Sequence, residues 1–231
     1  MKVMPSIDLS NGIAVKRVHG IRGSGIVVGN PVDVAYKLYE LGYDVLHVVD
    51  LDAAEGVGDN ENVIKELGKV GFMFLQVGGG IRSVEKAARI LSYGASAVVI
   101  STVYFTNRRI FNNIIRSVGG DKVIVALDYD SSHNVMIRGW KERAVSLHEA
   151  LQELATYMLR GVLFTYISSE GTEGGIDEHI ERFAATVRGL KEYAGGVSST
   201  EDLIKLKDMG FDYAIVGMAL YRGRLWGVRS V

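Results

Sequence analysis

The stretch Gly79-Gly80-Ile81-Arg82-Ser83-Val84-Glu85 returns half a chain later as Gly195-Gly196-Val197-Ser198-Ser199-Thr200-Glu201. The offset, 195 − 79 = 116 residues, holds without a gap, so that Gly94 falls on Gly210. Each copy predicts a glycine turn, a helix, a glycine stop, a buried strand and a second turn of small residues. Glycine turns let backbone N–H groups approach an anion, and the start of the following helix adds its positive dipole end. Two such turns in register indicate a duplicated half-barrel that binds a substrate with phosphate at both ends.

Short apolar runs of strand length alternate with helical patterns along the chain. We expect strands near residues 2–7, 44–50, 72–77, 96–101, 122–128, 161–167, 192–195 and 212–217. Helices are expected near 31–42, 59–70, 83–93, 107–117, 146–159, 176–190 and 199–209, with a shorter one after 218 and with Ser83 and Thr200 as N-caps. Eight such units predict an α/β fold, a TIM barrel that forms one domain over residues 1–231. An open doubly wound sheet is the alternative, and the half-chain repeat favours the barrel.

Composition limits the function classes. The formal net charge is −1, which argues against a general nucleic-acid or membrane-surface binder, because such proteins depend on a basic excess. The chain contains no cysteine, which excludes disulfides, thiolate zinc sites and cysteine nucleophiles. The sequence shows no signal peptide and no segment long enough to span a bilayer. We therefore expect a cytoplasmic protein; a monomer is our working expectation, although the sequence does not settle the oligomeric state.

Two aspartates end opposite strands of the expected barrel. Asp8 ends the first strand and Asp128 ends the fifth, and chemistry in such barrels lies at the carboxyl ends of the strands. Two separated carboxylates in differently polar settings can divide proton removal and proton donation between them. A strand-end aspartate can also simply cap a neighbouring turn or helix. The placement of the pair between two phosphate turns favours the catalytic interpretation.

The two aspartates and the glycine turns are part of a family resemblance that extends over residues 3–221. The chain resembles the ProFAR isomerase family of histidine biosynthesis, TIM barrels that convert an aminoaldose to an aminoketose by an Amadori rearrangement. The opening 5–12 is similar to the family's first strand with its catalytic aspartate, and 126–128 to its second. The segments 78–82, 101–102, 195–199 and 216–219 match its phosphate turns. Gly139-Trp140 matches its substrate-stacking loop, and Thr165 with Glu170-Gly171-Thr172 its threonine strand and glycine loop.

The resemblance implies a role for each of these residues. Asp8 would be the general base, Asp128 the general acid in ring opening, and Thr165 would hold a ring hydroxyl or orient Asp128. Trp140 would stack on the flat imidazole carboxamide. One phosphate would be held around Gly79, Gly80, Arg82, Ser101 and Thr102, and the other around Gly195, Gly196, Ser198, Gly217 and Met218, with Gly171 and Thr172 in the glycine loop. A proton-transfer isomerisation needs no metal or cofactor, and the sequence indicates neither.

The chain departs from the family pattern at two places. The loop after the first strand reads His19-Gly20-Ile21 and is glycine-rich over residues 20–25, which suggests a mobile lid with altered substrate contacts. Glu170 stands where the family has aspartate, which puts a direct substrate contact by this residue in question. For Arg82 two interpretations stay open: contact with substrate over the mouth, or an ion pair with a strand-end acid such as Asp50. His47 lies in an apolar run and is expected to be an interior, hydrogen-bonded histidine.

Four other functions compete with this interpretation. The cyclase subunit of imidazole glycerol phosphate synthase and phosphoribosylanthranilate isomerase both use a cysteine that this chain lacks. A bifunctional isomerase that acts on both aminoaldoses keeps the aspartate pair, so the lid loop would decide that case. From another class, the chain could bind a phosphorylated ligand without turning it over. The presence of Asp8, Asp128 and Thr165 together argues against a binding-only protein.

Overall fold

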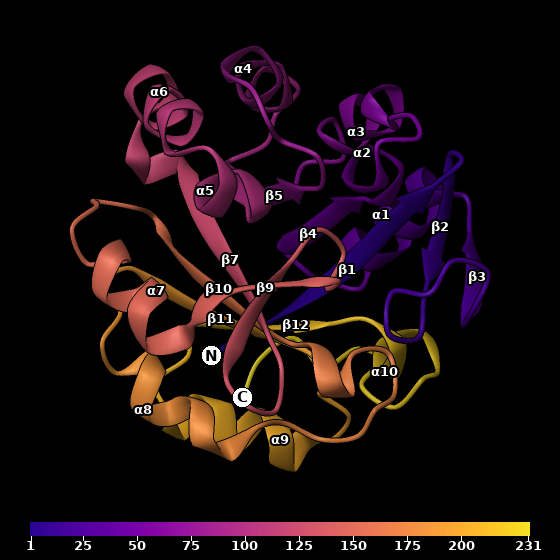
Figure 1. Ribbon diagram of the computed structural model, residues 1–231. Helices are drawn as coiled ribbons and strands as arrows, with labels where there is room; N and C mark the ends of the chain where they lie inside the picture. Colours follow the sequence, from indigo (N-terminus) through magenta and orange to yellow (C-terminus); the bar gives the residue numbers. More distant parts are fainter.

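Eight parallel strands form the centre of the computed structural model, which describes all of residues 1–231 (Figure 1). They are β1 (Lys2–Ser10), β4 (Val45–Asp50), β5 (Phe74–Gly78), β6 (Ala97–Ile100), β7 (Val123–Tyr129), β10 (Gly161–Tyr166), β11 (Leu190–Ala194) and β12 (Tyr213–Val216). Each strand pairs in parallel with its neighbours, and the pairing of β7 with β10 closes the sheet. The TIM-barrel prediction is therefore confirmed, and the open sheet is excluded.

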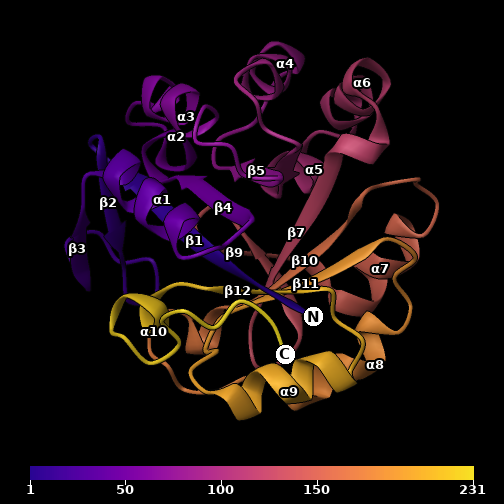
Figure 2. The same ribbon diagram turned by 180° about the vertical axis from the view of Figure 1, so that it is seen from behind.

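Helices surround the barrel, as Figures 1 and 2 show from its two ends. They are α1 (Pro31–Glu40), α3 (Glu61–Leu67), α4 (Val84–Ser92), α6 (Arg108–Val118), α7 (Leu147–Leu154), α8 (Glu181–Ala184), α9 (Thr200–Asp208) and α10 (Met218–Tyr221). Ser83 caps α4 as expected, whereas α9 is capped by Ser199, one residue before the expected Thr200. No helix combines the length and the apolar character needed to cross a bilayer.

The helix expected over 176–190 forms only in part. A 3₁₀ turn at Glu178–Ile180 leads into the single turn of α8, and the chain then leaves the helical conformation. Thr186 and Val187 follow α8, and β-branched side chains lower helix propensity at that point. Two short helices that we did not expect, α2 (Leu51–Glu55) and α5 (Thr102–Thr106), begin directly after β4 and β6.

Two hairpins that we did not expect rise from the carboxyl ends of the strands. β1 turns at Asn11-Gly12, where both residues have positive φ, and continues as antiparallel β2 (Ile13–Lys16), which pairs with β3 (Ile26–Gly29). Asn-Gly is the preferred pair for such a two-residue turn. The second hairpin, β8 (Asn134–Ile137) and β9 (Glu142–Ser146), continues from β7 and crosses in front of the barrel in Figure 1. The expected lid, residues 20–25, lies in the connection between β2 and β3.

Alternation along each strand divides the apolar side chains into two cores. One cluster lies inside the barrel and contains Met4, Val45, Phe74, Ala97, Val99, Ile124, Ala126, Leu163, Ala194 and Ile215. A larger cluster of 47 buried residues fills the space between strands and helices. Because successive strand residues point to opposite faces, continuing from the inner residue Met4 in steps of two brings Ser6 and Asp8 to the barrel axis. The same count from Ile124 brings Asp128 to the axis at the mouth.

Three polar side chains meet inside the barrel below the mouth. The amide nitrogen of Gln76 lies 2.7 Å from Oε2 of Glu192 and 2.9 Å from Nδ1 of His47. Burial lowers the pKa of His47 to about 3, so the ring is neutral and its Nδ1 accepts the bond, which confirms the expected interior histidine. Burial raises the pKa of Glu192 to about 7, and the bond from Gln76 only partly offsets that effect.

The buried carboxyl of Glu192 predicts a pH-dependent stability. Its pKa is about 7 in the folded chain against an ordinary value of 4.5, so the folded state binds more protons between these values and loses stability as pH rises through them. Glu192→Gln keeps the shape and removes this loss. We expect its free energy of unfolding, from urea titration, to exceed that of the parent by about 3 kcal/mol at pH 8 and by less than about 1 kcal/mol at pH 5.

The exposed Glu40 provides the matched control for this change. Glu40→Gln removes a charge of the same kind from the surface, and its effect should stay within about 0.5 kcal/mol at both pH values. A gain for Glu192→Gln that is equal at pH 5 and pH 8 would mean that Glu192 is not protonated in the folded protein.

Candidate active site

The mouth of the barrel collects three carboxyl groups. Asp8 lies on β1 and Asp128 on β7, four strands apart around the closed sheet, so they face each other across the axis as expected. Neither is the last residue of its strand, because β1 and β7 both continue into hairpins. Glu170, which follows β10, is the third carboxyl, and the charges of both aspartates contribute to raising its pKa.

Lys16 is the cation paired with Asp8. Its Nζ donates to Oδ1 of Asp8 at 2.7 Å and to Oγ of Ser6 at 2.6 Å. The side chain of Lys16 is 5% exposed and that of Asp8 16%, so solvent screens the pair only weakly. Lys16 reaches this position because β2 folds back beside β1, which sets Val15 opposite Asp8. The pair fixes the orientation of the Asp8 carboxylate and balances its charge.

Asp128 is held from two sides. The indole Nε1–H of Trp140 donates to its Oδ2 at 3.0 Å, and Thr165 lies opposite it in the ladder between β7 and β10. Loss of solvent raises the pKa of Asp128, and hydrogen bonds from Trp140 and Thr165 partly offset the rise. The Trp140 ring also lies against Gly20 of the glycine-rich loop, where a Cβ atom would meet it at 3.1 Å. Trp140 therefore lies over the mouth and joins both loops to Asp128.

Glu170 is the second carboxyl at the mouth whose pKa is raised. Burial raises its pKa to about 7; the nearby Lys16 ammonium opposes this rise, and the charges of Asp8 and Asp128 add to it. A carboxyl with a pKa near neutrality can donate and accept a proton under ordinary conditions. Glu170, whose substrate contact the sequence left in question, thus lies at the mouth near both aspartates.

The two glycine turns have the same local geometry. Gly79 and Gly195 have φ of 99° and 98°, and each packs on the backbone of the neighbouring strand end. A Cβ atom on Gly79 would lie 2.2 Å from the carbonyl oxygen of Asp50, and one on Gly195 would lie 2.3 Å from that of Tyr166. These two contacted residues are again 166 − 50 = 116 positions apart. This correspondence supports the interpretation of the repeat as two half-barrels.

The turns that follow β6 and β12 also correspond to each other in their backbone geometry. Ser101, before α5, has φ −122° and ψ −89°, and Gly217, before α10, has φ −116° and ψ −89°. Thr102 and Met218 are the first residues of these helices. The Thr102 hydroxyl accepts a bond of 3.3 Å from the backbone N–H of Arg138, which ties the β8–β9 hairpin to the first turn. The second turn, around Gly196, Gly217 and Met218, borders a hollow that Ser6 and Glu170 also line.

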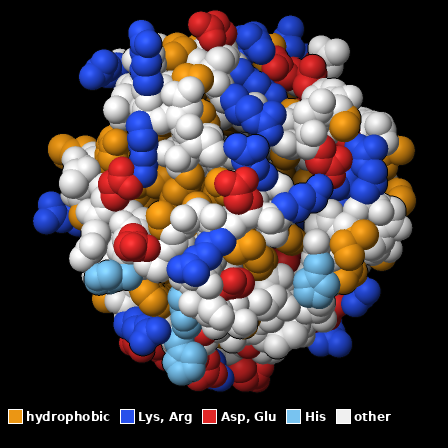
Figure 3. Space-filling view, in the orientation of Figure 1, with side chains coloured by type: hydrophobic (Ala, Val, Ile, Leu, Met, Phe, Trp, Pro, Cys, Tyr) orange, Lys and Arg blue, Asp and Glu red, His pale blue; other side chains and the backbone are white.

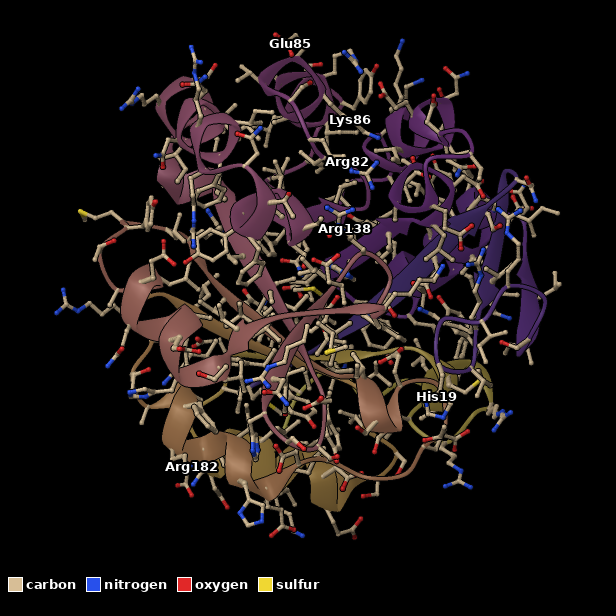
Figure 4. All side chains as sticks on the ribbon, viewed as in Figure 1. His19, Arg82, Glu85, Lys86, Arg138 and Arg182 are labelled. Carbon is tan, nitrogen blue, oxygen red and sulfur yellow. The ribbon has the colours of Figure 1, made fainter.

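Several residues that we predicted to contact substrate form hydrogen bonds within the protein in this structure. Arg82 donates to the carbonyl oxygens of Ala53 and Ala54, at 3.3 and 2.7 Å, so the proposed ion pair with Asp50 is absent. Asp50 instead accepts bonds from Asn60 and Ala53. Arg82 is exposed beside the mouth, and Figure 4 shows it near Lys86 and Arg138, on the side where Figure 3 shows Lys and Arg side chains gathered.

In the second half of the chain, other predicted substrate-binding residues likewise have partners within the protein. The backbone N–H and the hydroxyl of Ser198 both bond to Oδ2 of Asp202, at 2.9 and 3.1 Å. Gly171 packs on the backbone of Arg17, where a Cβ atom would lie 2.2 Å from its carbonyl oxygen, and the Thr172 hydroxyl donates to Ser169 O at 2.9 Å. Gly171 and Thr172 thus shape the glycine loop. The structure contains no cluster of three or more His, Asp or Glu side chains that could hold a metal ion.

Sequence reasoning missed Lys16, although a signal for it was present. The pair Asn11-Gly12 predicts a hairpin, and the alternation after it places Ala14 and Lys16 on the buried face of β2. A lysine at such a position must find a counter-charge, because a buried ammonium without one is costly.

Comparisons with known proteins agree with this geometry. The family model described as histidine biosynthesis protein matches residues 2–225. A protein of Saccharolobus solfataricus is 51% identical over 230 residues, covering 100% of this chain and 99% of that protein. Proteins of Methanosphaera stadtmanae and Thermus thermophilus are each 36% identical, over 96% and 97% of this chain and 95% and 96% of their own lengths. All three carry the name of a phosphoribosyl imidazole-4-carboxamide isomerase.

The shared packing of the two glycine turns predicts equal sensitivity to substitution. Gly79→Ala and Gly195→Ala each force a Cβ atom into a backbone carbonyl at a positive φ, so we expect each to lower the free energy of unfolding by about 3 kcal/mol or more. Gly12→Ala is the control, because Gly12 also has a positive φ but has open space around it, and the cost should be about 1 kcal/mol. Urea titration of the three variants measures the difference; equal costs would contradict the close approach.

Proposed function

The chain belongs to the histidine biosynthesis protein family, and from this premise we propose that it catalyses the ProFAR isomerase reaction. In that reaction an aminoaldose that carries two phosphates becomes an aminoketose by an Amadori rearrangement. The observation that supports this best is the position of Asp8 and Asp128 on opposite strands, with a glycine turn on either side of the mouth.

Asp128 begins the reaction as the general acid. It protonates the ring oxygen of the aminoaldose, so that the C1–O bond breaks and a Schiff base forms between C1 and the amino nitrogen. The raised pKa of Asp128 supports this role, because a carboxyl that retains its proton can donate it. The hydrogen bond from Trp140 and the neighbouring Thr165 keep the carboxyl directed at the mouth.

Asp8 completes the rearrangement as the general base. It removes the proton from C2, beside the Schiff-base carbon, and the electron pair moves toward the nitrogen to give an enaminol. The enaminol becomes the ketone when C1 gains a proton and the C2 hydroxyl loses its proton. Lys16, which also donates to Ser6 Oγ, binds Oδ1 of the Asp8 carboxylate, so that the other oxygen remains available to substrate. Glu170 lies near both aspartates and can donate or accept a proton in the second step, since its pKa is about 7.

The glycine turns hold the two phosphates, and the aromatic ring of Trp140 contacts the heterocycle. Backbone N–H groups around Gly80 and Thr102 bind one phosphate, and those around Gly196 and Met218 bind the other. Because both ends of the substrate are anchored, its central sugar carbons lie between Asp8 and Asp128, which is the positional contribution to catalysis.

Turnover of ProFAR by the purified protein tests the proposal, with phosphoribosylanthranilate assayed beside it. We expect conversion of ProFAR. Conversion of both substrates would indicate a dual-substrate isomerase, whereas conversion of neither by the folded protein would favour a barrel that only binds phosphorylated ligands.

Substitution of the two aspartates separates their roles. Asp8→Asn removes the base and keeps the shape, so we expect kcat to fall at least about a thousandfold with KM little changed. Asp128→Asn should lower kcat by about 10²–10⁴ for loss of the acid. Steady-state kinetics with ProFAR measures both, and full activity of Asp8→Asn would refute the mechanism.

The raised pKa of Glu170 predicts how kcat/KM changes on the alkaline side of its pH profile. If its protonated form is the active one, kcat/KM should fall as pH rises above about 7, because the proton is then lost. Glu170→Gln, which cannot titrate, should abolish that fall. An unchanged alkaline limb in this variant would assign the limb to another group, with Asp128 the first to examine.

A further inference from the structure

The second glycine turn carries a group of charges that the mechanism does not use. The carboxylate of Glu173 accepts a bond of 2.8 Å from NH1 of Arg222, and its other oxygen lies 2.8 Å from Nε of Arg224. The Glu173 side chain is 4% exposed, whereas those of Arg222 and Arg224 are 49% and 62% exposed. One buried carboxylate thus holds two arginines that are otherwise in solvent.

This carboxylate borders the hollow of the second turn. Glu173 lines it together with Gly196, Gly217 and Met218, whose backbone is the proposed phosphate cradle. Its Oε2 atom is buried and has no partner with the geometry of a hydrogen bond. A phosphate in this hollow would lie close to a like charge unless the two arginines offset that charge.

The first turn is built differently. At the offset of 116 residues, Arg82 of the first turn corresponds to Ser198, and Glu173 corresponds to Val57. The first turn thus contains an arginine where the second has Ser198, and the position that corresponds to Glu173 is the uncharged Val57. Lys16 also lies against Gly217, but its ammonium group is paired with Asp8. The two arginines on Glu173 are the further cations that the structure places at the border of the second hollow.

We propose that Glu173, Arg222 and Arg224 form an anion gate at the second glycine turn. Without ligand, Glu173 occupies the two guanidinium groups; a phosphate entering the hollow takes over their N–H donors. Guanidinium groups bind phosphate in two-point contacts, and the exposed side chains have room to turn. The gate rests on the proposed function, because it takes the second turn as a phosphate site.

Two features make this exchange of partners feasible. Glu173 has a positive φ of 58°, an uncommon conformation for this residue type, and Gly174-Gly175 follow it directly, so the segment has backbone freedom. Arg222 lies directly after α10, at the end opposite to Gly217, and its only side-chain hydrogen bond is the one to Glu173. The remaining N–H groups of Arg222 are thus available to an anion.

Titration with inorganic phosphate, followed by ¹H–¹⁵N NMR of the full chain, tests the gate. The amide signals of Gly196 and Gly217 report the second turn, and those of Gly80 and Thr102 report the first, so each turn gives its own Kd. Glu173→Gln removes the competing charge, and we expect it to lower Kd at the second turn about fivefold without changing the first. Replacing both Arg222 and Arg224 by Gln should raise Kd at the second turn about tenfold.

Glu178→Gln is the matched control, because Glu178 is exposed and pairs with Lys205 away from the hollow. It should leave both Kd values unchanged. A weaker or unchanged Kd at the second turn in folded Glu173→Gln would overturn the gate, as would an unchanged Kd in the double arginine variant. Absence of any response at both turns is a different result, and it would refute the phosphate assignment in the proposed function together with the gate.

Discussion

The parallel ladder between β7 and β10 is the interaction on which the rest of the molecule depends. It closes the sheet, and closure is what gives every strand an inner face. In its register Thr165 lies opposite Asp128, so the same hydrogen bonds that close the barrel set two candidate site residues side by side. An open sheet with the same strands would leave Asp8 and Asp128 without a common cavity.

Closure also explains why the charges at the mouth differ from charges on an ordinary surface. Asp8, Asp128 and Glu170 lie at one mouth, where loss of solvent raises the pKa of Asp128 and of Glu170, and the charges of both aspartates raise the pKa of Glu170 further. Lys16 enters from a hairpin outside the eight strands and balances this excess of negative charge. The hairpins therefore also contribute side chains to the mouth. The β1–β2 hairpin places Lys16 beside Asp8, and the β8–β9 hairpin places the Trp140 indole beside Asp128.

Much of this arrangement could be predicted from the sequence, for identifiable reasons. The repeated glycine turns and the buried runs are local signals, and they located the strands, the tight turns at the mouth and both aspartates. The ion pair of Lys16 with Asp8 depends on the β1–β2 hairpin, whose Asn-Gly turn was a local signal that we did not use. The partners of Arg82 could not be predicted, because α2 and the carbonyl groups near its C-terminal end take this position only in the folded chain.

The contact between Gln76 and Glu192 has a consequence for the history of the fold. The two residues are 192 − 76 = 116 positions apart, so corresponding places of the two halves touch each other inside the barrel. Two identical halves would set one side chain against its own copy here. Two glutamates would repel each other, whereas a glutamine can donate to a glutamate. Two copies of one short chain would always carry the same side chain at this position, so the glutamine–glutamate contact requires two halves that differ in sequence, as they do in this chain.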